Sequence, residues 1–514
     1  MIVWLWAFYF AVKLWLYFTG VIRIHFWSNL FLLLIAMPFT AAAKTAPRWR
    51  RILRQVAAVA LGVCVLWYDS YFPPFTYSLR FAIKNGGVLS SGFLLEFAHG
   101  FAISQVFLVG LILIAGLFLF AAKKRVNPTP WVFLALLIVF IQAMLGPNRT
   151  VSKAVAQFYA RENRRVVAFP KDLSSPPFDI VIIHICSLSW DDLEVAGRMH
   201  PRLLEGANIL FTDFNSATSY STPAALRLLR ASCGQLDHGR VHKPWPSNCN
   251  LLDQLRGAGY RTYAAFNTEP TYYEMSADLR RLAGLDVPIS IAGLPEQMLS
   301  YDDQPVFENG PELQRLLGAR EKGGASRAML FYNTMSLHGG GHENKPGWWK
   351  VPRVAFYAKA LDELGNDVQS FEKNLVADGR SAVLMIVPEH GAALRGTTIE
   401  AADLRDIPLP RITKVPVAVR FVGPLFVQAP SGLLVKRPSS YLALAQMLSE
   451  LLADPSIASD KTRLDQMLED LPQTEFMSES EKWKVFRFSG RYFVYGKDKT
   501  WTLLPADHEA APGG

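Results

Sequence analysis

The sequence predicts an α/β protein in two parts: an amino-terminal group of five transmembrane helices, then a doubly wound α/β domain with a small carboxyl-terminal antiparallel β element. Three observations predict this class. Apolar runs close to the roughly 20 residues that a bilayer span needs recur before residue 147. After residue 178, apolar strands alternate with helical segments. Near the end, residues 483–505 alternate in polarity around a Ser-Gly turn. We therefore divide the chain into 1–147, a connector at 148–178, and 179–514.

Composition excludes two broad classes of protein. The chain has 514 residues, of which 50% are hydrophobic, so it is too apolar to be disordered. The net charge of +9 belongs to the first 150 residues, which hold 13 Lys or Arg and two Asp or Glu. The remaining residues hold 40 Lys or Arg and 42 Asp or Glu, so this part of the chain is nearly neutral. Because nucleic-acid binding needs a basic face, we expect no nucleic-acid partner.

The five apolar runs predict membrane spans at about 3–21, 27–43, 52–68, 101–121 and 130–146. The first run lacks the charged start and the cleavage site of a signal peptide, so we expect it to be retained. Basic residues cluster at 44–54 and 123–125, and the positive-inside rule places these loops in the cytoplasm. Five spans then place the residues after 147 in the periplasm of a bacterium, anchored in the inner membrane.

Two features of the membrane part are left open. Lys13 lies inside the first predicted span, where it either extends its ammonium toward the membrane surface or carries an intramembrane function. The segment 70–100 is too polar and too rich in Pro and Gly to span, and it could form an interfacial helix on the outer face.

The second part follows an α/β pattern. Continuous apolar runs, typical of buried strands in a mostly parallel sheet, stand at 180–185, 260–266, 327–333, 382–387 and 415–422. Helical stretches lie at 222–231, 250–257, 354–377 and 440–453. Ligands of such folds bind beyond the carboxyl ends of the strands, so the residues that follow each strand are the candidates for chemistry.

Metal-ligand side chains follow two of these strands. Cys186 ends the strand at 180–185, and Glu389 and His390 follow the strand at 382–387. A thiolate, a carboxylate and an imidazole suit Zn²⁺, whereas the thiolate disfavours Mg²⁺, Ca²⁺ and Mn²⁺. The sequence therefore predicts a zinc site with one position open for a catalytic group.

Cysteine usage supports this assignment. The predicted periplasmic domain has three cysteines in an oxidising compartment. Pairing Cys233 with Cys249 would add about 3 kcal/mol on the loop-entropy model. Cys186 would then be left over at a strand end, either as a small core residue or as a ligand.

A hydroxyl-rich loop supplies candidate nucleophiles. It leads into the predicted helix at 222–231, and a helix amino terminus favours a phosphate group. From the residues alone, five hydroxyls compete for this role: Ser216, Thr218, Ser219, Ser221 and Thr222.

Four long motifs give the sequence a family resemblance. They are ICSLSWDDLEVAG (185–197), FNSATSYSTPAALRLLRASCGQ (214–235), FYNTMSLHGGGH (331–342) and VPEHGAALRG with the following LRDIPLPRITKVPVAVRFVG (387–423). A strand ending in a ligand, a hydroxyl at a helix start and a later Glu-His-Gly resemble the alkaline phosphatase/sulfatase superfamily. The full set resembles the bacterial cellulose phosphoethanolamine transferases, which are membrane-bound members of that superfamily.

The resemblance implies roles for individual residues. It places the zinc ligands on Cys186, Glu389 and His390, with the oxygen of Ser221 as a fourth. It identifies Ser221, which follows Tyr220, as the nucleophile, and Cys233–Cys249 as a disulfide. It also places an active-site histidine on His338 and an active-site arginine on Arg405. Tyr220 would either donate to a phosphate oxygen or pack against its neighbours.

The resemblance also implies a reaction and its partners. Phosphoethanolamine would move from phosphatidylethanolamine to glucose hydroxyls of cellulose through a phosphoethanolaminyl-serine. The expected partners are the cellulose synthase complex and its small accessory membrane subunits. Two alternatives remain: a transferase acting on another envelope glycan, such as lipid A or a teichoic-acid-like polymer, and a non-catalytic membrane-anchored scaffold.

Overall fold

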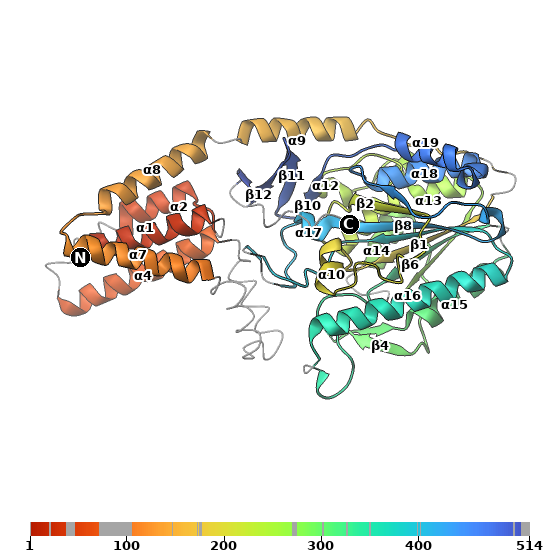
Figure 1. Ribbon diagram of the computed structural model, residues 1–514, viewed down its shortest axis with the longest axis horizontal. Coiled ribbons are helices and arrows are strands. Elements are labelled where there is room, and N and C mark those ends of the chain that lie inside the picture. The colour runs from red at the N-terminus through yellow and green to blue at the C-terminus, as the bar shows by residue number, and fades with distance from the viewer. Residues whose placement is uncertain are drawn as a thin grey trace. The chain divides into compact units, whose positions relative to one another are not determined.

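The computed structural model describes residues 2–504 except 20–21, 37–46, 71–104, 146–147, 172, 174–176, 270–274, 301–302, 325–326, 349–350, 398, 401 and 497–498. The chain forms two compact units. The first comprises residues 1–151, 396–404 and 498–505, and the second comprises the rest. Figure 1 shows the helices of the first unit in red and orange, and the sheet of the second in yellow, green and blue. The predicted interfacial segment 70–100 lies almost entirely outside the described residues.

Each of the five predicted spans contains a helix within the described residues of the first unit. Its helices are α1 (Ile2–Phe18), α2 (Phe26–Phe31) with a π-helical continuation η1 (Leu32–Ala36), α4 (Arg48–Asp69), α7 (Gln105–Lys123) and α8 (Thr129–Leu145). Within the described residues, only α4 is both long and apolar enough to cross a bilayer. The described parts of α1, α7 and α8 are shorter apolar helices.

A polar cluster is buried among these apolar helices. The Lys13 ammonium contacts the Asp69 carboxylate and the Asn29 side chain, and Lys13 is only 1% exposed. Asp69 also accepts hydrogen bonds from Asn29 and from the His25 ring. Lys13 therefore does not extend to a surface, as one of the two sequence-based readings supposed, but joins α1 to α2 and α4.

The second unit is built on a seven-stranded sheet of order β3-β6-β1-β7-β8-β2-β9. Its strands are β1 (Asp179–Ile185), β2 (Ile209–Asn215), β3 (Arg261–Phe266), β6 (Ala328–Thr334), β7 (Ala382–Pro388), β8 (Lys414–Val422) and β9 (Leu433–Val435). All five predicted strands are present, and β2 and β9 are additions. The sheet is mostly parallel, as predicted, but β8 runs antiparallel to both of its neighbours.

The direction of β8 follows from the path of the chain. After β7, residues 389–409 and the short helix α17 (Pro410–Thr413) join two adjacent strands without a crossover helix. The chain therefore re-enters the sheet at the edge it left, and β8 must run backwards. Glu389, His390 and Arg405 therefore lie at the carboxyl edge of the parallel strands, where Arg405 contacts Ser187 and His390.

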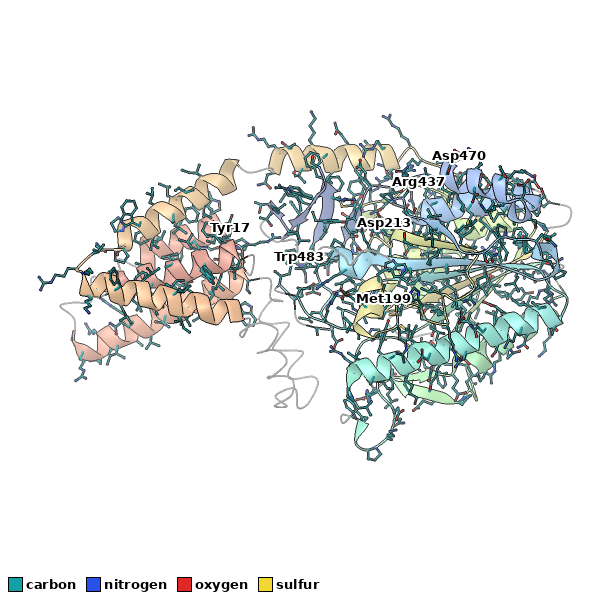
Figure 2. The ribbon with its side chains drawn as sticks, viewed as in Figure 1. Tyr17, Met199, Asp213, Arg437, Asp470 and Trp483 are labelled. Atoms are coloured by element: carbon teal, nitrogen blue, oxygen red, sulfur yellow. A yellow bond between two sulfur atoms is a disulfide. The ribbon has the colours of Figure 1, made fainter. Side chains whose placement is uncertain are left out.

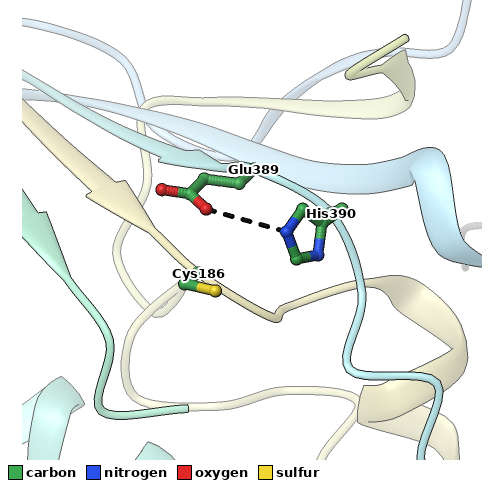
Figure 3. A group of neighbouring side chains, drawn as sticks. All are labelled: Cys186, Glu389 and His390. Carbon is green, nitrogen blue, oxygen red and sulfur yellow. Dashed lines mark ion pairs between the residues drawn. The ribbon is translucent and has the colours of Figure 1, made fainter. Parts of the chain in front are cut away.

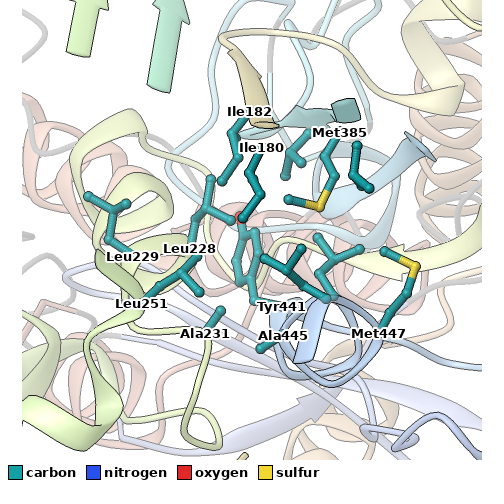
Figure 4. Close-up of a cluster of buried hydrophobic side chains, with 14 of the residues drawn as sticks. Ile180, Ile182, Leu228, Leu229, Ala231, Leu251, Met385, Tyr441, Ala445 and Met447 are labelled. Atoms are coloured by element: carbon teal, nitrogen blue, oxygen red, sulfur yellow. The ribbon is translucent and has the colours of Figure 1, made fainter. Parts of the chain in front are cut away.

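Helices cover both faces of the sheet, so the predicted doubly wound class is confirmed. Because side chains alternate along a strand, Ile180 and Ile182 of β1 face one core, whereas Val181, Ile183 and Ile185 face the other. The first core, part of which is drawn in Figure 4, packs against α11 (Ser221–Leu229), α13 (Leu251–Gly257), α14 (Met275–Ala283), α18 (Tyr441–Ala453) and α19 (Lys461–Asp470). The second packs against α10 (Trp190–Val195), α15 (Asn309–Lys322) and α16 (Arg353–Ala377).

Several smaller elements complete the fold. The predicted connector is largely a helix, α9 (Asn148–Glu162), and β4 (Glu296–Leu299) pairs with β5 (Pro305–Phe307). The short helices are α12 (His238–Val241), η3 (Ser247–Cys249), η6 (Pro424–Phe426) and η7 (Pro455–Ser459).

The predicted antiparallel element at the carboxyl terminus is also present. Strand β11 (Lys484–Phe488) pairs with β10 (Met477–Glu479) and with β12 (Arg491–Tyr495), and a short β13 (Trp501–Leu503) follows. Ser489 and Gly490 both have positive φ, as a two-residue hairpin turn requires.

Candidate metal centre

Three ligand-type side chains meet at the carboxyl edge of the central strands. Cys186 follows β1, while Glu389 and His390 follow β7, and β1 and β7 are neighbours in the sheet. One ligand atom from each lies within 4.8 Å of the others, and all three side chains are fully buried. Figure 3 shows the carboxylate, the imidazole and the thiol turned toward one another. The sheet topology thus brings together residues that are about 200 positions apart.

The two carboxylate oxygens of Glu389 have different surroundings. Oε1 accepts a hydrogen bond of 2.6 Å from the Asn333 amide, and it lies 3.1 Å from His184 Nδ1. Oε2 is buried and has no hydrogen-bond partner among the described residues, although it lies 3.7 Å from His390 Nε2. A buried carboxylate oxygen without a donor is costly unless a cation approaches it.

Ser221 lies directly beside this group. It is the first residue of α11, and the chain before it is extended at the N-cap Tyr220. Its Oγ lies 3.4 Å from Cys186 Sγ and 3.3 Å from His390 Nε2. Among the described residues, Ser221 is therefore the one of the five hydroxyl candidates that lies within hydrogen-bond distance of two ligand side chains.

The charges of the site fit a bound cation. Burial, together with the Glu389 charge, raises the pKa of the Cys186 thiol to about 12. Burial also acts to raise the pKa of Glu389, but other causes outweigh it, the first being the charge and hydrogen bond of His184, and lower this pKa to about 2. The site thus combines a fixed carboxylate with a thiol that needs a metal ion to ionise.

The histidine presents the correct nitrogen to a metal. Nδ1 of His390 lies 2.9 Å from the carbonyl oxygen of Gly391 and 3.3 Å from the Arg405 guanidinium, and the shorter contact, which is to an acceptor, favours the tautomer with the ring proton on Nδ1. Burial and the Arg405 charge lower the pKa of His390 to about 3, so the ring is neutral. Its Nε2 therefore points a lone pair into the site, as ligating histidines do.

Arg405 and His338 lie beside the three ligand side chains, because Arg405 contacts both His390 and His338. The Arg405 guanidinium donates to the Ser187 hydroxyl at 2.9 Å and lies 3.2 Å from His338 Nε2. His338 Nδ1 lies 2.7 Å from the Gly339 carbonyl, which fixes its proton there. Burial and the Arg405 charge lower the pKa of His338 to about 3, so this imidazole is also neutral.

Tyr220 directly precedes Ser221 in the sequence, and the two cysteines of the disulfide follow α11. Tyr220 is 40% exposed, and its hydroxyl donates to Asp406 at 2.5 Å. Cys233 and Cys249 form a disulfide, and Cys186 is a free, buried cysteine, so the structure contains the pairing that the sequence suggested.

Sequence reasoning missed the residues that hold the ligand loops. Asp192 of α10 accepts backbone hydrogen bonds from Ala392 and Leu394 and so anchors the loop after His390. A side chain at Gly391 would stand 2.5 Å from the Ser189 hydroxyl, so only glycine fits there. The signal was present, because Ser189 and Asp192 have the spacing of a helix capping box.

The residues fit zinc by their donor chemistry. Thiolate sulfur, imidazole nitrogen and a carboxylate oxygen form a catalytic-type zinc set with room for a fourth donor. The orphaned Glu389 Oε2 and the Nε2 of His390, which faces Ser221, are the atoms that such an ion would satisfy. The fold and the site together define an α/β domain that carries a candidate metal centre beside a serine at a helix start.

Comparison with known proteins identifies the family. The sequence profile of the cellulose biosynthesis protein BcsG carboxyl-terminal domain matches residues 142–501, and that of the BcsG amino-terminal domain matches residues 6–141. The chain is 30% identical to the cellulose biosynthesis protein BcsG of Salmonella typhimurium over 97% of its own length and 96% of the relative's. The BcsG of Escherichia coli gives the same values. The chain belongs to the BcsG family, which confirms the resemblance seen in the sequence.

Solved structures of the fold are more distant. The periplasmic domain of EptC from Escherichia coli, in complex with Zn, is 12% identical with a TM-score of 0.45, covering 68% of this chain and 99% of that domain. The lipooligosaccharide phosphoethanolamine transferase EptA from Neisseria meningitidis is 12% identical with a TM-score of 0.40, covering 90% and 98%. Because these values are low, the family assignment rests on the sequence matches.

Proposed function

We propose that this protein is a zinc-dependent phosphoethanolamine transferase that modifies cellulose. The observation that carries the proposal is the position of Ser221. Its oxygen lies within 3.4 Å of both a thiol and an imidazole ligand, beside a buried carboxylate oxygen that lacks a donor. Membership of a cellulose biosynthesis family supports cellulose as the acceptor. A lipid A-like or teichoic-acid-like acceptor remains the alternative within this chemistry.

Cys186, Glu389 and His390 would hold the zinc ion, and the Ser221 oxygen would complete the set. When bound, zinc would supply a Lewis acid that lowers the pKa of a neighbouring hydroxyl. In the first step the Ser221 oxygen forms a bond to the phosphorus of phosphatidylethanolamine, and the bond to the diacylglycerol oxygen breaks. The serine proton ends on that oxygen, so diacylglycerol leaves and phosphoethanolaminyl-serine remains.

In the second step a glucose hydroxyl forms a bond to the same phosphorus, and the bond to Ser221 breaks. The proton passes from the sugar to the serine. His338 would transfer the proton in both steps, as acid toward diacylglycerol and as base toward the sugar, and a phosphate anion bound beside Arg405 would raise its pKa from about 3 toward the range this role needs. Arg405, which contacts both His338 and Ser187, would bind the phosphate oxygens as their negative charge grows. Tyr220 would either bind the phosphate or position α11 through Asp406.

Membrane attachment would bring this site to its lipid donor. Large apolar side chains are exposed along α7 and α8, including Leu113, Leu117, Phe120, Leu137 and Ile141. Such surfaces are rare in water and normal in lipid. We propose that the helices of the first unit form a multi-pass anchor in the inner membrane, with the second unit in the periplasm. The cellulose synthase complex and its small accessory membrane subunits are the proposed partners.

The test is the intact mass of the full-length protein in vesicles that contain phosphatidylethanolamine. The wild-type chain should gain one phosphoethanolamine, and Ser221→Ala should gain none. Ser219→Ala is the matched control, because Ser219 is buried in the same loop and its hydroxyl has no partner among the described residues. Adduct on Ser221→Ala would overturn the assignment of the nucleophile. Unmodified protein together with the absence of released diacylglycerol would favour the scaffold alternative.

A further inference from the structure

A pocket separate from the metal centre opens on the same edge of the sheet. It has a volume of about 280 Å³, and its lining includes Asp213, Asn215 and Lys414 from the sheet and Glu475, Arg487 and Tyr492 from the carboxyl-terminal segment. None of these residues takes part in the chemistry proposed above. Asp213 is labelled in Figure 2.

The sheet fixes where this pocket lies. Asn215 ends β2 and pairs in register with Lys414, the first residue of antiparallel β8. Both therefore lie at the edge where β1 and β7 end, and the strand order is β1-β7-β8-β2. At roughly 5 Å per strand, the pocket begins about 10–15 Å along the edge from the ligand residues.

The chemistry of the lining suits a neutral, polyhydroxylated ligand. Lys414 and Arg487 balance Asp213 and Glu475, so the pocket offers both donors and acceptors without a net charge. Tyr492 packs edge-on against Phe476, with ring centres 5.1 Å apart, and this pair gives the pocket an apolar surface. The volume lies just below the roughly 300 Å³ at which drug-sized sites begin, which suits a single hexose.

Two of the charged side chains are available to a ligand. Asp213 and Lys414 pair with each other at 2.8 Å, whereas the Arg487 guanidinium has neither a hydrogen-bond nor an ion-pair partner among the described residues, only the face of Tyr492 at 5.8 Å. Glu475 is 57% exposed and meets only the exposed Arg161. Exposed pairs of this kind contribute little to stability, so Glu475 can exchange its partner at small cost.

We infer that this pocket binds a glucose unit of the acceptor chain a few units away from the one that is modified. This inference rests on the proposed function and specifies how that site holds its acceptor. It assigns Arg487 and Glu475 to acceptor binding. It also predicts that acceptors too short to reach from the metal centre to the pocket are bound more weakly than longer ones.

The test compares cellobiose with cellohexaose as acceptors for the full-length protein in phosphatidylethanolamine vesicles. For the wild type, the KM for cellohexaose should be at least about tenfold lower than for cellobiose, the loss expected of one or two charged hydrogen bonds. In Glu475→Ala/Arg487→Ala this advantage should disappear through a higher KM for cellohexaose alone. Cellobiose kinetics and formation of the Ser221 adduct should not change.

The matched control is Arg198→Ala/Asp362→Ala, which removes an exposed ion pair of the same charge elsewhere in the second unit. It should keep the wild-type preference for chain length. The inference is overturned if the pocket variant keeps that preference too, or if it slows adduct formation, which would assign the pocket to the lipid donor. If the wild type forms the Ser221 adduct but modifies neither oligosaccharide, the proposed acceptor is wrong. If the wild type forms no adduct, the proposed transfer from phosphatidylethanolamine to Ser221 is wrong.

Discussion

Each unit of the chain buries a polar cluster around one carboxylate, and the two clusters differ in how the carboxylate oxygens are used. In the first unit, Asp69 Oδ1 accepts from the His25 backbone and ring, and Oδ2 accepts from Asn29 and Lys13. In the second unit, Glu389 Oε1 accepts from Asn333, but Oε2 has no donor among the described residues. Both carboxylates are 0% exposed.

The difference separates a structural cluster from a ligand site. A fully paired carboxylate needs nothing further, so the Asp69 cluster holds α1, α2 and α4 together in its present form. An anionic carboxylate with an orphaned oxygen is incomplete until a cation arrives. Glu312 shows why the charge matters as well: both of its oxygens lack partners, but burial raises its pKa to about 7, so it can be neutral. Glu389, with a pKa of about 2, cannot.

The variant Glu389→Gln tests most directly whether the unpartnered carboxylate oxygen of Glu389 is a metal ligand. The amide oxygen can still accept from Asn333, so the unfolding free energy of the metal-free protein should change by less than about 1 kcal/mol. Zinc content should fall from one equivalent toward zero, and transfer should fall by at least about 10³-fold, because the anionic ligand is lost. Metal analysis and the transfer rate measure these effects.

Glu312→Gln is the control for Glu389→Gln. It replaces a buried carboxylate of the same unit that we do not assign to the metal, so zinc content and transfer should match the wild type. A Glu389→Gln protein that retained a full equivalent of zinc would show that the orphaned oxygen is not a ligand.

The converse change is Asp69→Asn in the first unit. It leaves the Lys13 ammonium buried without a counter-charge, which should destabilise the full-length protein in detergent by about 3–5 kcal/mol. Adding Lys13→Met should restore most of this loss, because the double variant buries no charge. Thermal unfolding of the wild type, the two single variants and the double variant measures the coupling free energy between Lys13 and Asp69. If Asp69→Asn unfolds like the wild type but abolishes transfer, the cluster is functional and the comparison fails.

Much of this site could be predicted from strand ends. Cys186, Glu389 and His390 follow continuous apolar runs that had to be central strands, and such ends meet at one edge. The choice of Ser221 among five hydroxyls was not available from local pattern, because it depends on where α11 starts relative to β1 and β7. The same is true of Asn333, which reaches Glu389 from β6, and of Asp192, which anchors a loop 200 residues away.

The strands β2 and β9 and the direction of β8 were not predicted, each for a different reason. Strand β2 reads ILFTDFN, and its polar Thr212 and Asp213 interrupt the apolar run by which the other strands were recognised. Strand β9 has three residues, too few to show a period. The antiparallel course of β8 depends on a segment that stays at one edge of the sheet, and no composition signal marks such a path.

The smallest predicted effect is the release of a proton when zinc binds, which makes the zinc affinity depend on pH. In the metal-free protein the Cys186 thiol has a pKa of about 12 and the His390 ring a pKa of about 3, so between pH 6 and 8 the thiol is protonated and the ring is neutral. Binding of zinc as a thiolate complex must then release about one proton, and none from His390. The apparent Kd for zinc should therefore fall about tenfold for each unit that the pH rises from 6 to 8.

Competition with a chromophoric chelator at several pH values gives this slope, and calorimetry in two buffers of different ionisation heat counts the proton. Cys186→Ala should bind zinc more weakly and lose the slope, because no thiol remains to ionise. An affinity independent of pH in the wild type would mean that Cys186 is not a ligand. The metal centre differs here from the Lys13–Asp69 ion pair. The Cys186 thiol becomes charged only when zinc binds, whereas Lys13 and Asp69 pair within the protein itself.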